Sequence, residues 1–137
     1  MQKIQHTIMD NKLNICQWNI RGFTMNKLFL EHIIQEKYIS IFALQETYLD
    51  EDKDINFKNY ELFRKDRNVN GGGVMLRVHK SINCQRLNIN TDLEVVAIEI
   101  FFGSNSLKIF NIYVPPLNNS FIGHLDEALK QIGDTCP

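Results

Sequence analysis

The sequence predicts an α/β fold in which one strand-helix-strand unit is followed by a run of antiparallel strands and a second helix. Two apolar segments flank a stretch with helical spacing, several short strand-like segments follow, and an amphipathic stretch comes last. This order differs from the steady strand-helix alternation of doubly wound and barrel folds. At 137 residues, with 44% hydrophobic and 23% charged residues, the composition is that of one ordinary globular domain.

The first unit begins with a strand over residues 13–18. A helix is expected over residues 26–37, with Thr24 or Asn26 as its cap, because these residue types accept hydrogen bonds from free backbone amides. The apolar residues that recur at helical spacing are Phe29, Leu30, Ile33 and Ile34. Residues 39–44 are almost continuously apolar, which is typical of a strand covered on both faces. The two strands are therefore predicted to be parallel.

The second part of the chain follows a carboxylate-rich loop over residues 50–59. Short strands are expected over residues 60–63, 74–78 and 82–87. Two longer strands, 93–102 and 107–114, are joined by a Gly-Ser-Asn-Ser turn that is typical of a hairpin. Ser120 then caps a second helix, whose predicted apolar face consists of Phe121, Leu125, Ala128, Leu129 and Ile132.

Charge and cysteine content narrow the class of protein. The net charge of -1 excludes binding to nucleic acid through bulk positive charge, so such binding needs a local patch or a metal ion. The three cysteines are far apart and odd in number, which is typical of reduced thiols in an intracellular protein. A signal peptide and a membrane span of about 18 apolar residues are both lacking, so a soluble intracellular protein is expected.

Three polar residues share one position in the predicted topology. Asn19 follows the first strand, Glu46 follows the buried strand, and Tyr113 lies at the end of the last long strand. In sheets flanked by helices, ligands gather at the carboxyl ends of strands. Taken singly, each residue is more often a cap, a turn residue or a packed aromatic, but the coincidence of all three favours a site.

The sequences around these residues resemble a known superfamily. The segments Gln17–Gly22 (QWNIRG), Leu44–Thr47 (LQET) and Asn111–Pro116 (NIYVPP) occur in order, and Arg64–Arg67 and a Gly-rich strand start at 71–74 lie between the last two. Together they resemble the endonuclease/exonuclease/phosphatase superfamily. The likeness is greatest to the apurinic-endonuclease-like domain that opens the polyprotein of LINE-type (non-LTR) retrotransposons, jockey-like elements in particular.

The resemblance implies a fold and a domain division. The fold would be part of a deoxyribonuclease-I-like α/β/β/α sandwich, truncated, in which two mixed sheets are flanked by helices. Residues 1–12 would be a polar N-terminal extension, and residues 13–137 would be the N-terminal half of the domain. The superfamily's later motifs, a Gly-Asp-Phe-Asn strand end and a terminal Ser-Asp-His, do not occur in this sequence.

The resemblance also implies a metal site. Glu46 would bind the catalytic Mg²⁺ or Mn²⁺, Asn19 would orient the metal-bound site, and Tyr113 would lie near the scissile phosphate. One Glu is sufficient in principle, since Mg²⁺ often takes one or two carboxylates together with phosphate oxygens. Arg21 stands where apurinic endonucleases carry an acidic residue, which favours the retrotransposon branch over abasic-site repair.

The implied function is a metal-dependent phosphodiester hydrolase, a retrotransposon-type DNA endonuclease that nicks target DNA. Without the later motifs the chain is expected to be inactive alone, so its standing as an enzyme stays open. Two alternatives remain: a non-catalytic truncated remnant, or a phosphatase or phosphodiesterase of the same superfamily. The implied partners are DNA and the reverse-transcriptase portion of the same polyprotein, with no membrane. The implied location is the nucleus for an active endonuclease and the cytoplasm otherwise.

Two further features concern the middle of the chain. Basic residues gather there and would contact DNA phosphates or form a solvated face; they are Arg64, Lys65, Arg67, Arg77, Lys80 and Arg86. The run Gly71-Gly72-Gly73 lacks the Lys-Ser/Thr of a phosphate-binding loop, so it is interpreted as a turn into a strand with positive φ angles.

Overall fold

The computed structural model describes residues 12–50, 55, 57–67, 71–116 and 121–133. Within these ranges the order of elements follows the sequence prediction. The elements are β1 (Ile15–Asn19), α1 (Phe23–Lys37), β2 (Ile41–Gln45), β3 (Tyr60–Lys65), β4 (Val74–His79), β5 (Asn83–Leu87), β6 (Glu94–Phe102), β7 (Asn105–Tyr113) and α2 (Phe121–Gly133). The predicted cap residue Ser120 and the predicted apolar-face residues Phe121 and Ile132 are outside the set of residues whose side chains the structure describes.

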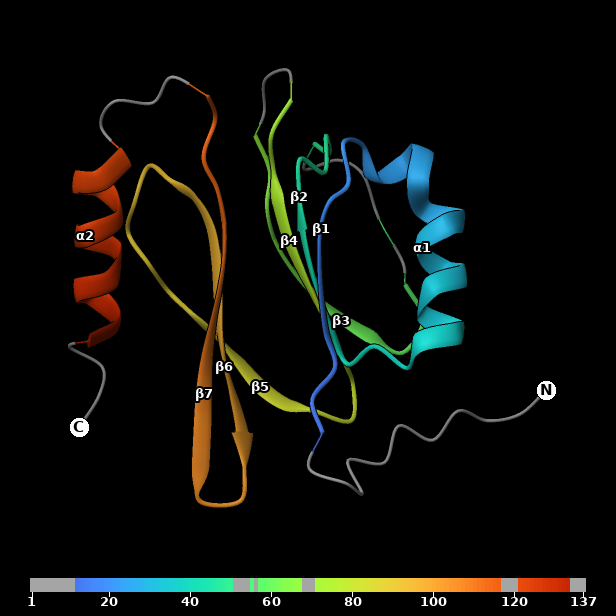
Figure 1. Ribbon diagram of the computed structural model, residues 1–137. Helices are drawn as coiled ribbons and strands as arrows, with labels where there is room; N and C mark the ends of the chain where they lie inside the picture. The colour runs from blue at the N-terminus through green and yellow to red at the C-terminus, as the bar shows by residue number, and fades with distance from the viewer. Residues whose placement is uncertain (1–11, 51–54, 56, 68–70, 117–120, 134–137) are drawn as a thin grey trace.

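The strands form two sheets that pack face to face between the two helices (Figure 1). The first sheet has the order β1-β2-β4-β3; β1 and β2 are parallel, as predicted, and the other pairs are antiparallel. The second sheet, β5-β6-β7, is antiparallel in its described strands. Helix α1 covers the outer face of the first sheet and α2 that of the second. The predicted four-layer α/β/β/α arrangement is confirmed.

Strand β2 is buried along its whole length because its two faces meet different layers. Phe42 and Leu44 pack toward α1, whereas Ile41 and Ala43 pack toward the second sheet. The alternation follows from the strand period of two, which sends successive side chains to opposite faces. The continuous apolar sequence of this segment is thus explained by cover on both sides, as the sequence analysis predicted.

A buried arginine lies in the layer between the first sheet and α1. Arg77 is 2% exposed, and its guanidinium lies 5.2 Å from the ring centre of Phe57 and 5.8 Å from that of Phe23. It donates a hydrogen bond to the carbonyl of Ile55 at 3.1 Å. Burial lowers the pKa of Arg77 to about 10, so the side chain keeps its charge at neutral pH. These contacts tie the chain after β2 to the sheet.

Two local predictions were wrong. Helix α1 begins at Phe23 after Gly22, whose φ of 109° suits glycine, and no side chain caps it. Asn26 lies inside the helix, and its side-chain amide donates to the carbonyls of Ile20 and Gly22. In α2, Leu129 is half exposed because Ala128 meets the sheet, and one helical step turns its neighbour about 100° away.

No described helix is long and apolar enough to cross a membrane.

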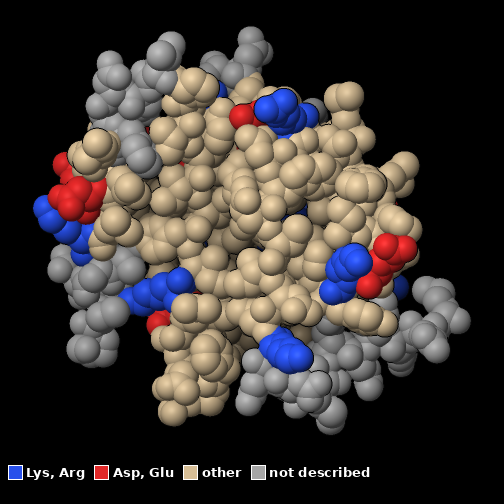
Figure 2. Space-filling view, viewed as in Figure 1, with Lys and Arg blue, Asp and Glu red and all other residues tan. Residues whose placement is uncertain are grey.

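Strands β1 and β7 each pair with another described strand on one side only. A groove of about 560 Å³ is lined by residues of both strands, including Gln17 and Asn19 of β1 and Asn111 and Tyr113 of β7. Figure 2 shows that charged side chains lie mostly around the rim of the visible face and leave its centre largely uncharged. Two free strand edges therefore border one groove, and this groove leads to the strand ends described next.

Candidate active site

The structure brings the three strand-end residues together. Asn19 ends β1, Glu46 directly follows β2, and Tyr113 ends β7. Parallel pairing places Asn19 opposite Gln45, so the Asn19 side chain lies beside Glu46, the residue that follows Gln45. The Asn19 amide donates to Glu46 Oε1 at 3.1 Å, and Tyr113 lines the same groove as Asn19, with its hydroxyl near enough to the Glu46 carboxylate to help lower its pKa. The predicted meeting of these residues at one edge of the sandwich is therefore observed.

A fourth residue, Tyr48, belongs to the same cluster and was missed by the sequence analysis. Its hydroxyl donates to Glu46 Oε2 at 2.8 Å, opposite the bond from Asn19. The side chain of Tyr48 is 46% exposed, so its ring forms part of the site surface. No local pattern indicates that an aromatic residue two positions after a strand-end carboxylate will bind it. The contact depends on the backbone conformation of the segment that joins the two residues.

The backbone conformation explains how Tyr48 reaches Glu46. Glu46 and Tyr48 have φ angles of 53° and 55°, in the left-handed region that non-glycine residues seldom adopt. Each such residue costs on the order of 1–2 kcal/mol, which surrounding contacts must offset. The Glu46 carbonyl accepts from the Gly22 amide at 2.8 Å, and the Tyr48 amide donates to the Gly72 carbonyl at 3.0 Å. Backbone strain of this kind is concentrated at functional sites.

The glycine run supports this segment from the other side. Gly71, Gly72 and Gly73 all have positive φ angles, as predicted. A Cβ atom on Gly73 would lie 2.5 Å from Thr47 Oγ1, so a side chain there would displace the segment that carries Glu46. The run therefore provides close backbone approach in addition to a turn.

An ion pair lies on the Tyr113 side of the site. The Nε and Nη2 groups of Arg67 donate to the two oxygens of the Glu94 carboxylate. Glu94 Oε1 also accepts from the Gly73 amide at 2.8 Å. The Arg67 guanidinium lies 5.8 Å from the ring centre of Tyr113. Such bidentate, charge-assisted bonds fix orientation as well as adding energy. The pair thus holds the glycine run and the Tyr113 ring in one arrangement.

The electrostatics favour a charged carboxylate at the centre of the cluster. Hydrogen bonds from Asn19, then Tyr48, hold the pKa of Glu46 below its ordinary value of 4.5, with Tyr113 and the charge of Arg21 adding to the effect. Desolvation, followed by the hydrogen bond to Glu46, raises the pKa of Tyr113. At neutral pH the site therefore presents one carboxylate anion among neutral hydrogen-bond donors.

The oxygen atoms of this cluster provide some of the ligands of a hard divalent cation. The charged carboxylate of Glu46 and the amide oxygen of Asn19, whose nitrogen is already engaged, are oxygen ligands of the kind that Mg²⁺ and Mn²⁺ prefer. Among the described residues no group of three or more His, Cys, Asp and Glu side chains could enclose a metal ion. The set fits a cation that takes its remaining ligands from water and from phosphate oxygens.

Comparison with known proteins defines the class of fold. No family model matches the sequence, and no curated protein matches it. Solved structures do match, and the α/β/β/α sandwich is the deoxyribonuclease-I-like fold that those structures share, as predicted.

Three of these structures illustrate the likeness. The endonuclease domain of TRAS1, a telomere-specific non-LTR retrotransposon, aligns with a TM-score of 0.70 over 90% of this chain and 55% of its own, at 13% identity. The 3′ phosphatase NExo from Neisseria, bound to a product DNA hairpin, gives 0.66 over 90% and 54%, at 15% identity. TDP2 of D. rerio, complexed with single-strand DNA product, gives 0.59 over 93% and 57%, at 18% identity. The chain thus spans about half the length of the structures it resembles.

The hydrogen bond from Tyr48 leads to a prediction about Glu46. Replacing Tyr48 by phenylalanine removes the bond to Oε2 and keeps the ring, so the pKa of Glu46 should rise toward its ordinary value. The carboxyl titration is followed by NMR in the absence of metal. Tyr38→Phe, which alters an exposed tyrosine at the end of α1, should leave the titration unchanged. An unaltered Glu46 pKa in Tyr48→Phe would refute the assigned bond.

Proposed function

We propose that this chain forms the N-terminal half of a divalent-metal-dependent phosphodiesterase domain that acts on DNA, of the retrotransposon endonuclease type. The observation that carries the proposal is the meeting of Asn19, Glu46 and Tyr113 at the carboxyl ends of three strands, within a fold shared with DNA-processing enzymes. The domain division is residues 1–12 as a polar extension and residues 13–137 as the half-domain.

The half-domain proposal is supported by the free edges. Unpaired strands invite further pairing, and β1 and β7 each leave one edge open beside a largely uncharged face. Similar structures are nearly twice as long as the part that aligns with this chain. A second half would cover the groove between β1 and β7 and bring its own polar residues next to Asn19 and Tyr113.

The proposed roles follow from the geometry. Glu46 and the amide oxygen of Asn19 would hold Mg²⁺ or Mn²⁺, which when bound stabilises negative charge on the phosphate and on the leaving oxygen. Tyr113 would donate its one hydroxyl proton to a phosphate oxygen once substrate is bound, and Tyr48 keeps the Glu46 carboxylate oriented. The group that deprotonates the attacking water belongs to the second half.

The test is a plasmid-nicking assay on the protein that contains residues 1–137 together with their natural continuation. We expect Mg²⁺-dependent conversion of supercoiled to open-circular DNA, stopped by a chelator. The 137-residue chain alone should be at least about 100-fold slower, because a general base typically contributes about 10²–10⁴-fold. Nicking that persists in chelator would refute the metal dependence, and no nicking by the longer protein would favour the non-catalytic remnant.

A phosphatase or DNA-end phosphodiesterase is the second candidate, favoured by the likeness to NExo and TDP2. An oligonucleotide with a 3′ phosphate separates the two. Release of phosphate from that end without plasmid nicking would support the second candidate and overturn the endonuclease. A reverse-transcriptase partner and a nuclear location are proposed only for the endonuclease function.

A further inference from the structure

The six basic residues in the middle of the chain differ in their surroundings, and Lys80 alone is an exposed cation outside both groups described next. Arg64 pairs with Asp66 at 3.1 Å, Arg67 pairs with Glu94, and Arg77 is buried between aromatic rings. These three side chains are occupied in holding the fold together. The interpretation of all six cations as one solvated or DNA-binding face is therefore too simple. Lys65 and Arg86 differ from the others because both line a single cavity.

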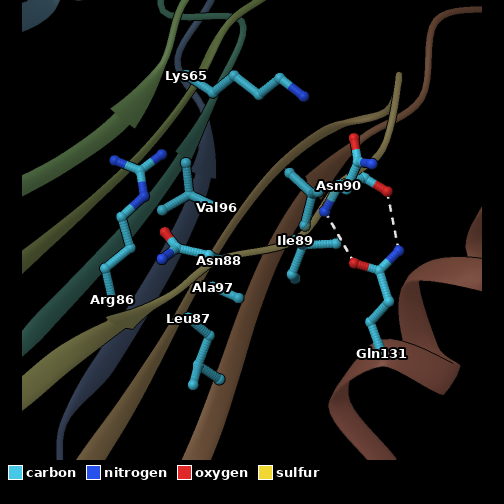
Figure 3. A pocket seen from close by; sticks show the side chains of 10 residues that line it. Lys65, Arg86, Leu87, Asn88, Ile89, Asn90, Val96, Ala97 and Gln131 are labelled. Atoms are coloured by element: carbon cyan, nitrogen blue, oxygen red, sulfur yellow. Dashed lines mark hydrogen bonds between the residues drawn. The ribbon is translucent and has the colours of Figure 1, made fainter.

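This cavity, hereafter the α2 cavity, has a volume of about 540 Å³. It lies between the end of β3, strand β5 with the loop after it, the start of β6, and α2 (Figure 3). Its polar lining consists of Lys65, Arg86, Asn88, Asn90 and Gln131, and none of its described lining residues is acidic. Two cations and three amides around one hollow form a lining suited to an anion.

The walls of the α2 cavity are held in place by hydrogen bonds. Gln131 of α2 clasps the backbone of Asn90: its Oε1 accepts from the Asn90 amide at 2.8 Å, and its Nε2 donates to the Asn90 carbonyl at 2.8 Å (Figure 3). The Lys65 ammonium donates to the carbonyls of Thr91 and Leu93 at 2.9 and 2.6 Å. The loop between β5 and β6 is thus fastened to both α2 and β3, so the cavity is preformed.

Both cations keep hydrogen-bond donors for a ligand. The Lys65 ammonium has three N–H groups and uses two on the loop carbonyls. Arg86 has five, and among the described residues it donates one of them, to the Arg64 carbonyl at 3.3 Å. Desolvation lowers the pKa of Lys65, the charge of Arg86 adds to this, and Asp92 and Glu94 oppose it. An anion placed between the two cations would offset the desolvation of Lys65 and the repulsion between the two charges.

The position of the α2 cavity relates it to the candidate active site. Val95 and Val96, which line it, directly follow Glu94, and Glu94 is paired with Tyr113 across β6 and β7. The β6 side of the cavity therefore lies toward the end of the sandwich that carries Tyr113. A polyanion bound at the candidate site could extend over this end to Lys65 and Arg86.

We propose that the α2 cavity binds a phosphate of the DNA backbone outside the candidate active site, with Arg86 and Lys65 as its cationic partners. The phosphodiester is the ligand class that fits two adjacent cations with free donors, and its identification as DNA rests on the proposed function. Arg86 provides the cleaner variant, because Lys65 also supports the loop.

The test measures duplex DNA binding to the full chain in chelator, as a function of salt. Arg86→Gln should weaken binding about threefold to tenfold at low salt and lower the slope of log K against log salt by about 0.9, the value for one lost phosphate contact. Arg86→Lys should retain most of the slope. Lys80→Gln, an exposed cation of the same sequence region outside the cavity, should leave the slope unchanged.

An unchanged slope in Arg86→Gln, or an equal loss in Lys80→Gln, would overturn the proposal. A titration with inorganic phosphate, followed by NMR of the Arg86 and Asn90 N–H signals, provides the second readout. Shifts there without any effect of Arg86→Gln on DNA affinity would indicate a free-phosphate site and equally overturn it. Because DNA binding is measured without metal, a negative result for Arg86→Gln does not bear on the nicking test of the proposed function. A negative nicking result likewise does not affect the measurement of the salt dependence.

Discussion

Replacing Glu46 by glutamine is expected to abolish metal-dependent nicking by the longer protein, with a loss of at least about 10²–10³-fold. Glutamine has the same shape and its one carbonyl oxygen can still accept from Asn19 or from Tyr48, but it lacks the negative charge that a divalent cation requires. The fold is therefore expected to survive while the site loses its function.

Metal affinity provides the second measurement for this variant, on the 137-residue chain itself. Mn²⁺ binding followed by electron paramagnetic resonance should weaken at least about tenfold in Glu46→Gln. Glu36→Gln, which makes the same chemical change on the exposed face of α1, is the matched control and should bind Mn²⁺ like the natural chain. Equal affinities in all three proteins would show that Glu46 is not a metal ligand.

The second large effect is expected at Asn111, whose replacement by alanine should lower the free energy of unfolding by about 3 kcal/mol. Asn111 is 2% exposed and connects the two sheets. From β7 it donates to the carbonyls of Leu44 and Met75 at 2.9 and 2.7 Å, and it accepts from the side chain of Gln45. Its removal takes one hydrogen-bond partner from each of these buried groups, which costs more than the hydrogen bonds themselves contribute.

Asn111→Asp separates the hydrogen bonds from the packing, because aspartate has the same size. The aspartate anion would face two carbonyl oxygens in a buried site, so its pKa in the folded state should rise above the unfolded value of about 3.9. Stability should then be greatest below that pH and fall as pH rises through the folded pKa. Chemical denaturation at several pH values measures this, with the exposed Asn83→Ala as control. A pH-independent loss equal to that of Asn111→Ala would contradict the assigned donors.

Much of the fold was predictable because its signals are local. The continuous apolar run in β2, the helical spacing in α1 and the turn residues between β6 and β7 each depend on neighbours within a few positions. Helix starts and exposed faces were predicted less well. Leu129 illustrates the reason: its spacing fits an apolar face, but the small Ala128 decides which side of α2 meets the sheet.

The candidate site divides in the same way. Its three strand-end residues could be predicted, because a polar residue after an apolar strand is a local signal and parallel pairing brings such ends together. Tyr48 could not, because its approach to Glu46 requires left-handed backbone at both residues, held by the distant amide of Gly22 and the carbonyl of Gly72.

Local patterns encode the order of elements and the placement of Asn19, Glu46 and Tyr113 at strand ends. The partners of the polar and charged side chains depend on how the layers pack. Asn111 connects the sheets through Gln45, 66 positions away, and Lys65 and Arg86 share a cavity while Arg77 is buried. The physical reason is that periodicity and turn chemistry act over a few residues. The partner of a charge or amide, in contrast, is whatever the packed layers bring within hydrogen-bond reach.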